Sequence, residues 1–376
     1  MGSSPICSTK ILNLRIEDFF ICLRWLFLFF KGFIPYALPD VIYCTSAAHI
    51  VRGWTERMNC NMKSFDKVSL GLFPTPLVHL DNLSRMLGTH IWVKRDDLCG
   101  VALGGNKVRK LEYLLADARA RGYDLVMTTG QAQSNHAMLT AACALRLGMD
   151  CVLVLKERGV TACRGNQILN RLMNVEVIYV DTDSYDEIYA EMDRIAAARG
   201  RRVYKIPCGG SNALGSLGYV DCMREISECG QHFDAVYCAC GSGGTAAGTA
   251  LGASIYLPDT RVICPMVDSD PFERIVPDLM REAADLLQTG VRLNPPEFMD
   301  LCGPGYSIPS AEGNEAIALM MRSEGIVLDT CYTGKAFAGL LRQVRAGRYG
   351  AEDNVLFIHT GGAGGLFAQD WEKMTL

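Results

Sequence analysis

A lysine follows two glycines and an asparagine in the motif Gly104-Gly105-Asn106-Lys107. The glycines permit a tight turn, Asn106 is a good helix N-cap residue, and apolar residues then recur at helical spacing. The positive end of the helix dipole and any burial would lower the pKa of Lys107. A partly neutral lysine is a nucleophile for an aldehyde, as the cofactor pyridoxal phosphate (PLP) requires. Alone, the motif also fits a solvated basic helix start.

A glycine-rich turn offers a second candidate site. Gly241, Ser242, Gly243, Gly244 and Thr245 lie between a predicted strand (235–240) and a predicted helix (246–254). Their free N–H groups and the positive helix end suit a phosphate. No Lys-Ser or Lys-Thr follows, which excludes a P-loop. The turn also fits the dinucleotide pattern G-x-G-x-x-A, with Asp268 as a ribose-binding acid, so a nicotinamide or flavin oxidoreductase is an alternative, as is a purely structural turn.

Further polar and aromatic residues follow predicted strands or turns. The loop Gln133-Ser134-Asn135-His136 lies beyond a strand at 125–129, and ligands of open α/β sheets bind beyond the carboxyl ends of strands. Tyr306 lies in a rigid Gly- and Pro-containing loop. Tyr332 and Thr333 follow a predicted strand that begins at Ile326 and turns into a helix at 335–344. Isolated tyrosines are usually core or surface residues, but Tyr306 and Tyr332 follow or lie among turn residues, where side chains can point into a cleft.

Alternating strands and helices must position these residues. Strands are predicted at 90–97, 125–129, 151–155, 176–180, 202–206, 235–240, 261–267 and 356–358, and helices at 80–88, 107–121, 137–147, 167–173, 184–199 and 246–254. This alternation predicts a layered α/β protein. With 376 residues, 49% hydrophobic and 21% charged, the chain can form two domains.

The composition of the chain limits the classes of binding partner that it can have. A net charge of −4 gives no electrostatic footprint for nucleic acid. The sixteen cysteines lack CxxC and metal-ligand spacing, which predicts reduced thiols of an intracellular protein and no metal site. Residues 1–60 differ from the rest, and the apolar run 19–31 is interrupted by Arg24. They fit an organelle-targeting presequence, a membrane-associating arm or a dispensable stretch.

From about Phe73 to the C-terminus the chain resembles a known family. The motifs FPTPL, KRDD, GGNKxRKLEYL, QSNH, GGSNALGSLGY, GSGGT, LDxxYTGKA and HTGG follow one another as in the D-cysteine desulfhydrase and 1-aminocyclopropane-1-carboxylate (ACC) deaminase family. The resemblance implies the tryptophan-synthase-β-like PLP fold, an α/β fold with two open twisted, mostly parallel sheets, helices on both faces and the cofactor between the domains. It implies an N-terminal extension (1–61), a large domain (62–103 and 220–376) and a small domain (104–219).

The resemblance also implies roles for individual residues. Lys107 would form the internal aldimine, and the loop 241–245 would hold the cofactor phosphate. Asn135 would bind the pyridine hydroxyl, and Thr333 would face the pyridine nitrogen. The substrate carboxylate would bind to Gln133, Ser134, Asn135 and His136, although His136 could instead be structural. Tyr306 and Tyr332 would line the substrate side, and Lys107, Ser134, Tyr306 and Tyr332 form the predicted catalytic set.

Thr333 separates the two activities of the family. The deaminases resemble one another in carrying a glutamate there, which keeps the pyridine nitrogen protonated, whereas a hydroxyl suits elimination of a good leaving group. The resemblance therefore implies a carbon–sulfur lyase that converts D-cysteine to pyruvate, hydrogen sulfide and ammonia. ACC deamination, L-cysteate sulfo-lyase activity and a non-catalytic PLP carrier are alternatives. A cytoplasmic homodimer is expected, with no membrane for the catalytic part, or a mitochondrial protein if residues 1–60 act as a presequence.

Overall fold

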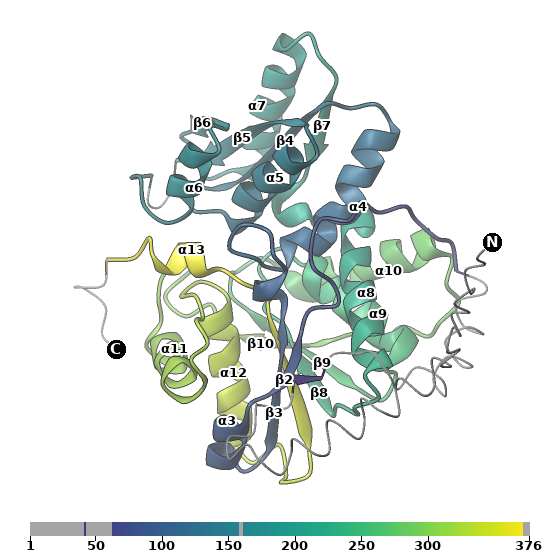
Figure 1. Ribbon diagram of the computed structural model, residues 1–376, viewed down its shortest axis with the longest axis vertical. Coiled ribbons are helices and arrows are strands. Elements are labelled where there is room, and N and C mark those ends of the chain that lie inside the picture. Colours follow the sequence, from purple (N-terminus) through teal and green to yellow (C-terminus); the bar gives the residue numbers. More distant parts are fainter. Residues whose placement is uncertain (1–40, 43–61, 158–160, 371–376) are drawn as a thin grey trace, which may run out of the picture. The chain divides into compact units, whose positions relative to one another are not determined.

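A computed structural model describes residues 41–42, 62–157 and 161–370 of the chain, all within one compact unit, Asp40–Leu376. Two β-sheets form its framework, and helices pack on both faces of each (Figure 1). The predicted α/β fold with two open sheets is therefore confirmed. The predictions for residues 1–60 lie outside the described residues, apart from Val41–Ile42.

In the part of the chain that the structure describes, the larger sheet has seven strands. Their spatial order is β1 (Val41–Ile42), β2 (Leu77–His79), β3 (His90–Arg95), β11 (Asn354–His359), β8 (Ala235–Tyr237), β9 (Arg261–Met266) and β10 (Glu297–Asp300). β1, β2 and β3 pair antiparallel, and all the other neighbours pair parallel. The carboxyl ends of five strands, β3 to β10, therefore lie at one edge of the sheet.

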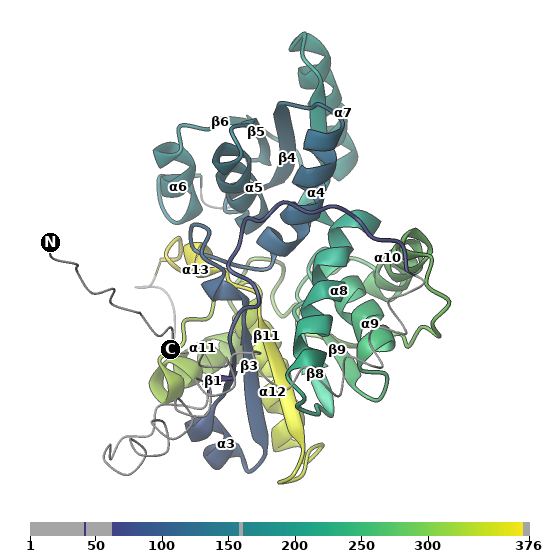
Figure 2. The same ribbon diagram turned by 45° about the vertical axis from the view of Figure 1, so that its right-hand side comes forward.

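Alternating side chains of this sheet build two cores. Leu356 and Ile358 of β11 pack on one side with α8 (Ala213–Glu228), α9 (Gly244–Tyr256) and α10 (Phe272–Leu287). Val355 and Phe357 pack on the other side with α3 (Asp81–Leu87), α11 (Ala311–Glu324) and α12 (Thr333–Arg345). Figure 2 shows β3 and β11 side by side between these helix layers. The period of two along a strand explains the division.

The smaller sheet has four strands, all parallel. Their order is β6 (Glu176–Val180), β5 (Asp150–Lys156), β4 (Leu125–Gln131) and β7 (Val203–Ile206). Its helices are α4 (Lys107–Ala120), α5 (Asn135–Arg146), α6 (Asn166–Leu172) and α7 (Tyr185–Ala198). α4 and α5 pack on one face, and α7 packs on the other.

Short elements connect or follow the strands. They are the 3-10 turns η1 (Asp96–Leu98) and η2 (Cys208–Gly210) and the helix α13 (Ala363–Leu366). No described helix is both long and apolar enough to cross a membrane. The division into a large and a small domain stays a prediction.

Three sequence expectations need correction. The strand predicted from Ile326 does not form, because this apolar segment is buried in the α11–α12 core without a neighbouring strand to pair with. Asn106 does not cap α4, since its backbone is already helical (φ −55°, ψ −24°) and its side chain binds elsewhere. Eleven described cysteines are free, as predicted, but Cys229 is disulfide-bonded, so the prediction of a reduced thiol is wrong for that residue.

Candidate active site

A cavity of about 290 Å³ opens where strands of both sheets end. Its walls come from the segments after β4, β7, β8, β9 and β11, from the start of α4, and from the loop and turn that carry Tyr306 and Tyr332. This is the position expected for a ligand in open α/β sheets. Of the predicted site residues, the following line it: Lys107, Ser134, Asn135, His136, Gly241, Ser242, Gly243, Thr245, Tyr306 and Tyr332.

Lys107 is the first residue of α4 and lines the cavity. Burial lowers the pKa of its ammonium to about 8, and the nearby thiols of Cys208 and Cys331 only partly oppose this shift. A substantial fraction of Lys107 is therefore neutral near physiological pH. Of the two causes that the sequence predicted for a lowered pKa, the helix dipole and burial, burial is the one that the structure supplies.

The residues before Lys107 are fixed against the large sheet. The amide of Asn106 donates to the carbonyl of Thr360 (3.1 Å), and Gly105 forms a bridge with Gly361 beyond β11. Gly105 has φ 131°, and a Cβ there would lie 2.8 Å from the Thr360 oxygen. The Asn106 side chain donates to Thr245 Oγ1 (2.9 Å) and so links this turn to the glycine loop. Only glycine permits such a close approach.

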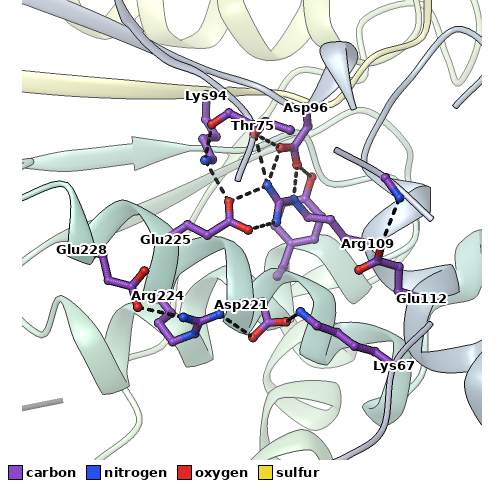
Figure 3. Close-up of polar contacts among 12 residues, drawn as sticks. Lys67, Thr75, Lys94, Asp96, Arg109, Glu112, Asp221, Arg224, Glu225 and Glu228 are labelled. Carbon is purple, nitrogen blue, oxygen red and sulfur yellow. Dashed lines mark hydrogen bonds and ion pairs between the residues drawn. The ribbon is translucent and has the colours of Figure 1, made fainter. Parts of the chain in front are cut away.

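A buried charge network fixes α4 from the other side (Figure 3). Arg109 binds both oxygens of Asp96 at 2.8 Å and both oxygens of Glu225 at 2.7 and 2.9 Å. Lys94 also contacts Glu225 (2.9 Å), and Thr75 bonds to Asp96 (2.7 Å). Burial alone would raise the pKa of Asp96, but Arg109 outweighs it and holds that pKa below its usual range. Two cations and two carboxylates thus compensate one another and fix the position of Lys107.

The glycine loop leads into α9 and presents backbone rather than side chains. Gly243 has φ 84°, and a Cβ on Gly244 would lie 2.7 Å from Ser211 Oγ and 2.9 Å from Lys110 Nζ. Amides at a helix N-terminus form an anion cradle, and close packing behind Gly244 leaves no room for a side chain there. The loop therefore fits a phosphate.

Lys110 lies behind this cradle and was not predicted. It is fully buried and donates to the Gly209 carbonyl (3.1 Å) and to Ser211 Oγ (3.3 Å). Ser211 in turn contacts Ser242 Oγ (2.9 Å) and accepts from the Gly244 amide (3.2 Å). Burial, and then the charge of Lys107, lowers the pKa of Lys110 well below its usual value. Lys110 lies one turn after Lys107 on α4, and this spacing is the feature of the sequence that could have indicated its place near the site.

The Ser134 loop forms the opposite wall. Ser134 caps α5 by accepting from the Ala137 amide (3.1 Å), so the positive end of this helix faces the cavity. A hydroxyl and a helix N-terminus suit a carboxylate. Asn135, the next residue, also lines the cavity, with Oδ1 accepting from Asn166 Nδ2 (2.7 Å).

His136 and Gln133 have structural contacts. His136 is buried, its Nε2 contacts Thr128 Oγ1 (2.8 Å), and burial, followed by Lys107 and Lys110, lowers its pKa well below the usual value. It therefore lines the cavity as a neutral ring. Gln133 does not line the cavity; its side chain binds the backbone of Arg164 and Asn166.

Tyr306 and Tyr332 meet in the cavity. Their hydroxyls form a short hydrogen bond, and their rings cross edge to face with centroids 5.9 Å apart. Burial raises the pKa of both phenols well above the usual value, so both stay protonated. Lys335 fixes the Tyr306 loop by donating to the carbonyls of Cys302 (2.6 Å) and Gly305 (2.8 Å).

Thr333 and Gly244 do not line the cavity. The Thr333 hydroxyl donates to Asp329 Oδ1 (2.6 Å) and accepts from the Asp329 amide (2.7 Å). Thr360, which follows β11, lines the cavity instead and was not predicted. Its place at a strand end was the signal that the sequence offered.

Comparisons with known proteins agree with this geometry. A family described as pyridoxal-phosphate dependent enzyme matches residues 68–361. The chain is 41% identical over 316 residues to a Pyrococcus horikoshii protein provisionally named 1-aminocyclopropane-1-carboxylate deaminase, covering 81% of this chain and 94% of the relative. A crystal structure of an ACC deaminase homologue has a TM-score of 0.77 and 40% identity, with the same coverage. The processed threonine deaminase isoform 2 of Solanum lycopersicum (TM-score 0.59, 17% identity, 99% and 97% coverage) shares the fold alone.

The chain belongs to the PLP-dependent enzymes. Within them it belongs to the fold-type II family of ACC deaminase and D-cysteine desulfhydrase, with the tryptophan-synthase-β-like fold. Its cofactor is PLP, and the poised amine of Lys107 and the glycine cradle fit that molecule. The nicotinamide or flavin alternative is therefore not retained. Among the residues that the structure describes, no group of His, Cys, Asp or Glu side chains could hold a metal ion.

Proposed function

We propose that the protein converts D-cysteine and water to pyruvate, hydrogen sulfide and ammonia. The observation that carries the proposal is the neutral residue at position 333, where the deaminases carry a glutamate. A threonine has no carboxylate that could keep the pyridine nitrogen protonated, and the hydroxyl of Thr333 is itself bonded to Asp329. A substrate with a good leaving group at Cβ needs less electron withdrawal than an unactivated cyclopropane.

PLP, when bound, supplies the electron sink that makes the Cα proton acidic. Lys107 would hold it covalently, and the amides of 241–245 would hold its phosphate, supported by Ser211 and Lys110. Asn135 would contact the pyridine hydroxyl. The threonines at 333 and 360 are the two candidates near the pyridine nitrogen, and only Thr360 lines the cavity.

Ser134 and the N-terminus of α5 would bind the substrate carboxylate through the Ser134 hydroxyl and first-turn amides. This anchor would orient the amino acid so that its Cα proton faces Lys107. The neutral ring of His136 would close the wall beneath without adding charge.

Two groups in the cavity would move protons during the elimination. Lys107 Nζ, neutral once the substrate amine has replaced it, would accept the proton as the Cα–H bond breaks. The Tyr306–Tyr332 pair would supply a proton to the sulfur as the Cβ–S bond breaks, because both phenols remain protonated. The enamine product would then add water and release ammonia.

ACC deamination is the second candidate, because the relatives at 41% and 40% identity carry that name. L-cysteate sulfo-lyase activity is a third reaction on the same fold. Lys107 would keep its role in all of them, since each begins with an amino acid joined to PLP.

The test compares substrates side by side on one preparation. Purified PLP-loaded protein is incubated with D-cysteine, L-cysteine, β-chloro-D-alanine, ACC and L-cysteate, and keto acid, sulfide and sulfite are measured. We expect keto acid from D-cysteine and β-chloro-D-alanine, with sulfide from D-cysteine only. Keto acid from ACC with no sulfide from D-cysteine would replace the proposal by the deaminase. Borohydride reduction and peptide mapping should place PLP on Lys107.

Assembly and location are also proposals. A second copy of this chain is the expected partner, measured by light scattering. The catalytic part is expected in the cytoplasm or, if residues 1–60 act as a presequence, in mitochondria; imaging of the full chain and of a chain without residues 1–60 distinguishes the two.

A further inference from the structure

Asn166 is a buried polar residue next to the cavity that has no role in the function proposed above. It is the first residue of α6, its side chain is 0% exposed, and it does not line the cavity. Its Nδ2 donates to the Gln133 carbonyl (2.8 Å) and to Asn135 Oδ1 (2.7 Å). Its backbone amide donates to Gln133 Oε1 (2.9 Å). It thus joins two residues of the cavity-wall loop.

Backbone groups determine how these amides are oriented. The Gln133 carbonyl can only accept, so the Asn166 atom that faces it must be the nitrogen. The second hydrogen of the same nitrogen points to Asn135, which must therefore turn its oxygen toward Asn166. The main-chain carbonyl of Gln133 therefore determines which end of the Asn135 amide faces Asn166. The side-chain nitrogen and oxygen of Asn135 do not have to be told apart by position alone.

The surrounding backbone is shaped around Asn166. A Cβ on Gly364 would lie 1.9 Å from Asn166 Oδ1, and a Cβ on Gly165 would lie 2.4 Å from the Gly364 oxygen and 2.6 Å from Gln133 Oε1. Gly165 also has φ 51°. The two glycines leave room for the Asn166 side chain and little else, so its amide is held in one place.

We infer that Asn166 is a positioning residue, which orients the Asn135 amide so that its NH₂ group faces the cavity as a hydrogen-bond donor. No described residue accepts from this NH₂ group, and Asn135 lines the cavity. The inference rests on the proposed function, in which Asn135 contacts the pyridine hydroxyl. That oxygen is ionised when PLP is joined to lysine, so it needs a donor, and a reversed amide would present a repelling oxygen.

The predicted consequence is spectroscopic. When PLP is bound, a hydrogen bond donated by Asn135 to its ring oxygen would make that oxygen a weaker partner for the proton on the lysine-linked nitrogen. Loss of the donor should therefore raise the pKa at which the yellow form of the PLP-loaded protein titrates. One hydrogen bond to a charged oxygen corresponds to a rise of about one pKa unit.

The test is a pH titration of the visible absorption band in four PLP-loaded variants. In Asn166→Asp the new side chain has nearly the same shape as asparagine but can donate at most one hydrogen bond. The Gln133 carbonyl would accept that bond, so none would remain for Asn135. Asn170→Asp is the matched control, a buried asparagine of the same helix with no contact to Asn135. Asn135→Ala and the double variant Asn135→Ala/Asn166→Asp complete a double-mutant cycle. PLP affinity of the four apoproteins is measured in parallel.

We expect Asn166→Asp and Asn135→Ala to raise the titration midpoint, the double variant to match Asn135→Ala, and Asn170→Asp to match the wild type. A wild-type midpoint for Asn166→Asp, an equal shift in Asn170→Asp, or additive shifts in the double variant would each overturn the inference. If Asn166→Asp does not fold, Asn166→Ala also removes the donor and replaces it in the cycle. A wild-type midpoint for Asn135→Ala would instead reject the Asn135 contact assumed in the proposed function, and sulfide assays test turnover separately.

Discussion

The two walls of the cavity are built in opposite ways. The wall at the large sheet includes a stretch of bare backbone, because Gly241 and Gly243 of the loop 241–245 line the cavity and carry no side chain. The wall at the small sheet consists of the side chains of Ser134, Asn135 and His136 at the start of α5. A backbone wall can recognise a constant group such as a phosphate, whereas a side-chain wall can change its partner by a single substitution. We therefore expect cofactor binding to depend on the first wall and substrate choice on the second.

Lys107 stands between the walls, and its loss should have the largest effect. Lys107→Ala removes both the covalent attachment and the base at Cα, so sulfide formation should fall on the order of a thousandfold or more. Turnover assays and borohydride labelling measure this. Unchanged sulfide release by Lys107→Ala would rule out the proposed mechanism.

A methyl group at Gly244, which packs against Ser211 and Lys110 behind the glycine loop, should weaken the binding of PLP. Gly244→Ala forces a Cβ to within 2.9 Å of Lys110 Nζ and against Ser211, and such overpacking corresponds to about a ten- to hundredfold rise in the PLP dissociation constant. Gly290→Ala, where a Cβ meets nothing within 4 Å, is the control. Equal affinities in the two variants would contradict a backbone-built cradle.

The attachment of PLP to the apoprotein should depend on pH through Lys107. The neutral amine is the nucleophile, so the rate should rise as pH increases through the pKa of about 8 and level off above it. Between pH 7 and pH 9 the neutral fraction grows about tenfold. Stopped-flow absorption measures the rate; a rise that continues beyond pH 10, as for a free lysine, would show that burial does not lower the pKa.

A substitution in the side-chain wall should weaken substrate binding and leave the affinity for PLP unchanged. Ser134→Ala removes a hydroxyl donor from the predicted carboxylate site and should raise KM for D-cysteine about five- to tenfold. It also removes the α5 cap, at a cost of about 1 kcal/mol in the free energy of unfolding. Ser310→Ala removes the corresponding cap of α11, a helix from which no residue lines the cavity, and should lower stability alone. A KM equal to wild type would remove Ser134 from the substrate site.

Substitution of either threonine should have a smaller effect, and the effect should differ between Thr333 and Thr360. Thr360→Val changes a cavity residue and should lower kcat about threefold without loss of stability, whereas Thr333→Val breaks two buried bonds to Asp329 and should lower the melting temperature with little change in kcat. Paired melting curves and kinetics decide between them. The reverse result would assign Thr333 to the pyridine nitrogen, as the family resemblance implied.

Much of this site could be predicted from the chain alone. Apolar runs of strand length alternating with helical patterns predicted most strands of both sheets, and glycines next to Lys107 and at 241–245 marked the turns where a ligand approaches backbone. Such signals are local, because a strand, a helix or a turn is determined by residues close together in the chain. The motif order then sufficed to name the family that the comparisons confirm.

Only the tertiary structure decided which side chains face the cavity. Thr333, Thr360 and Gln133 all lie in family motifs. Yet Thr333 bonds to Asp329, Thr360 lines the cavity, and Gln133 bonds to Asn166 outside the cavity lining. These assignments depend on contacts between segments distant in the chain, which residue type and spacing do not encode. The pKa of Lys107 depends on the same kind of contact, because the burial that the sequence could only suppose is produced by the packing around the amine.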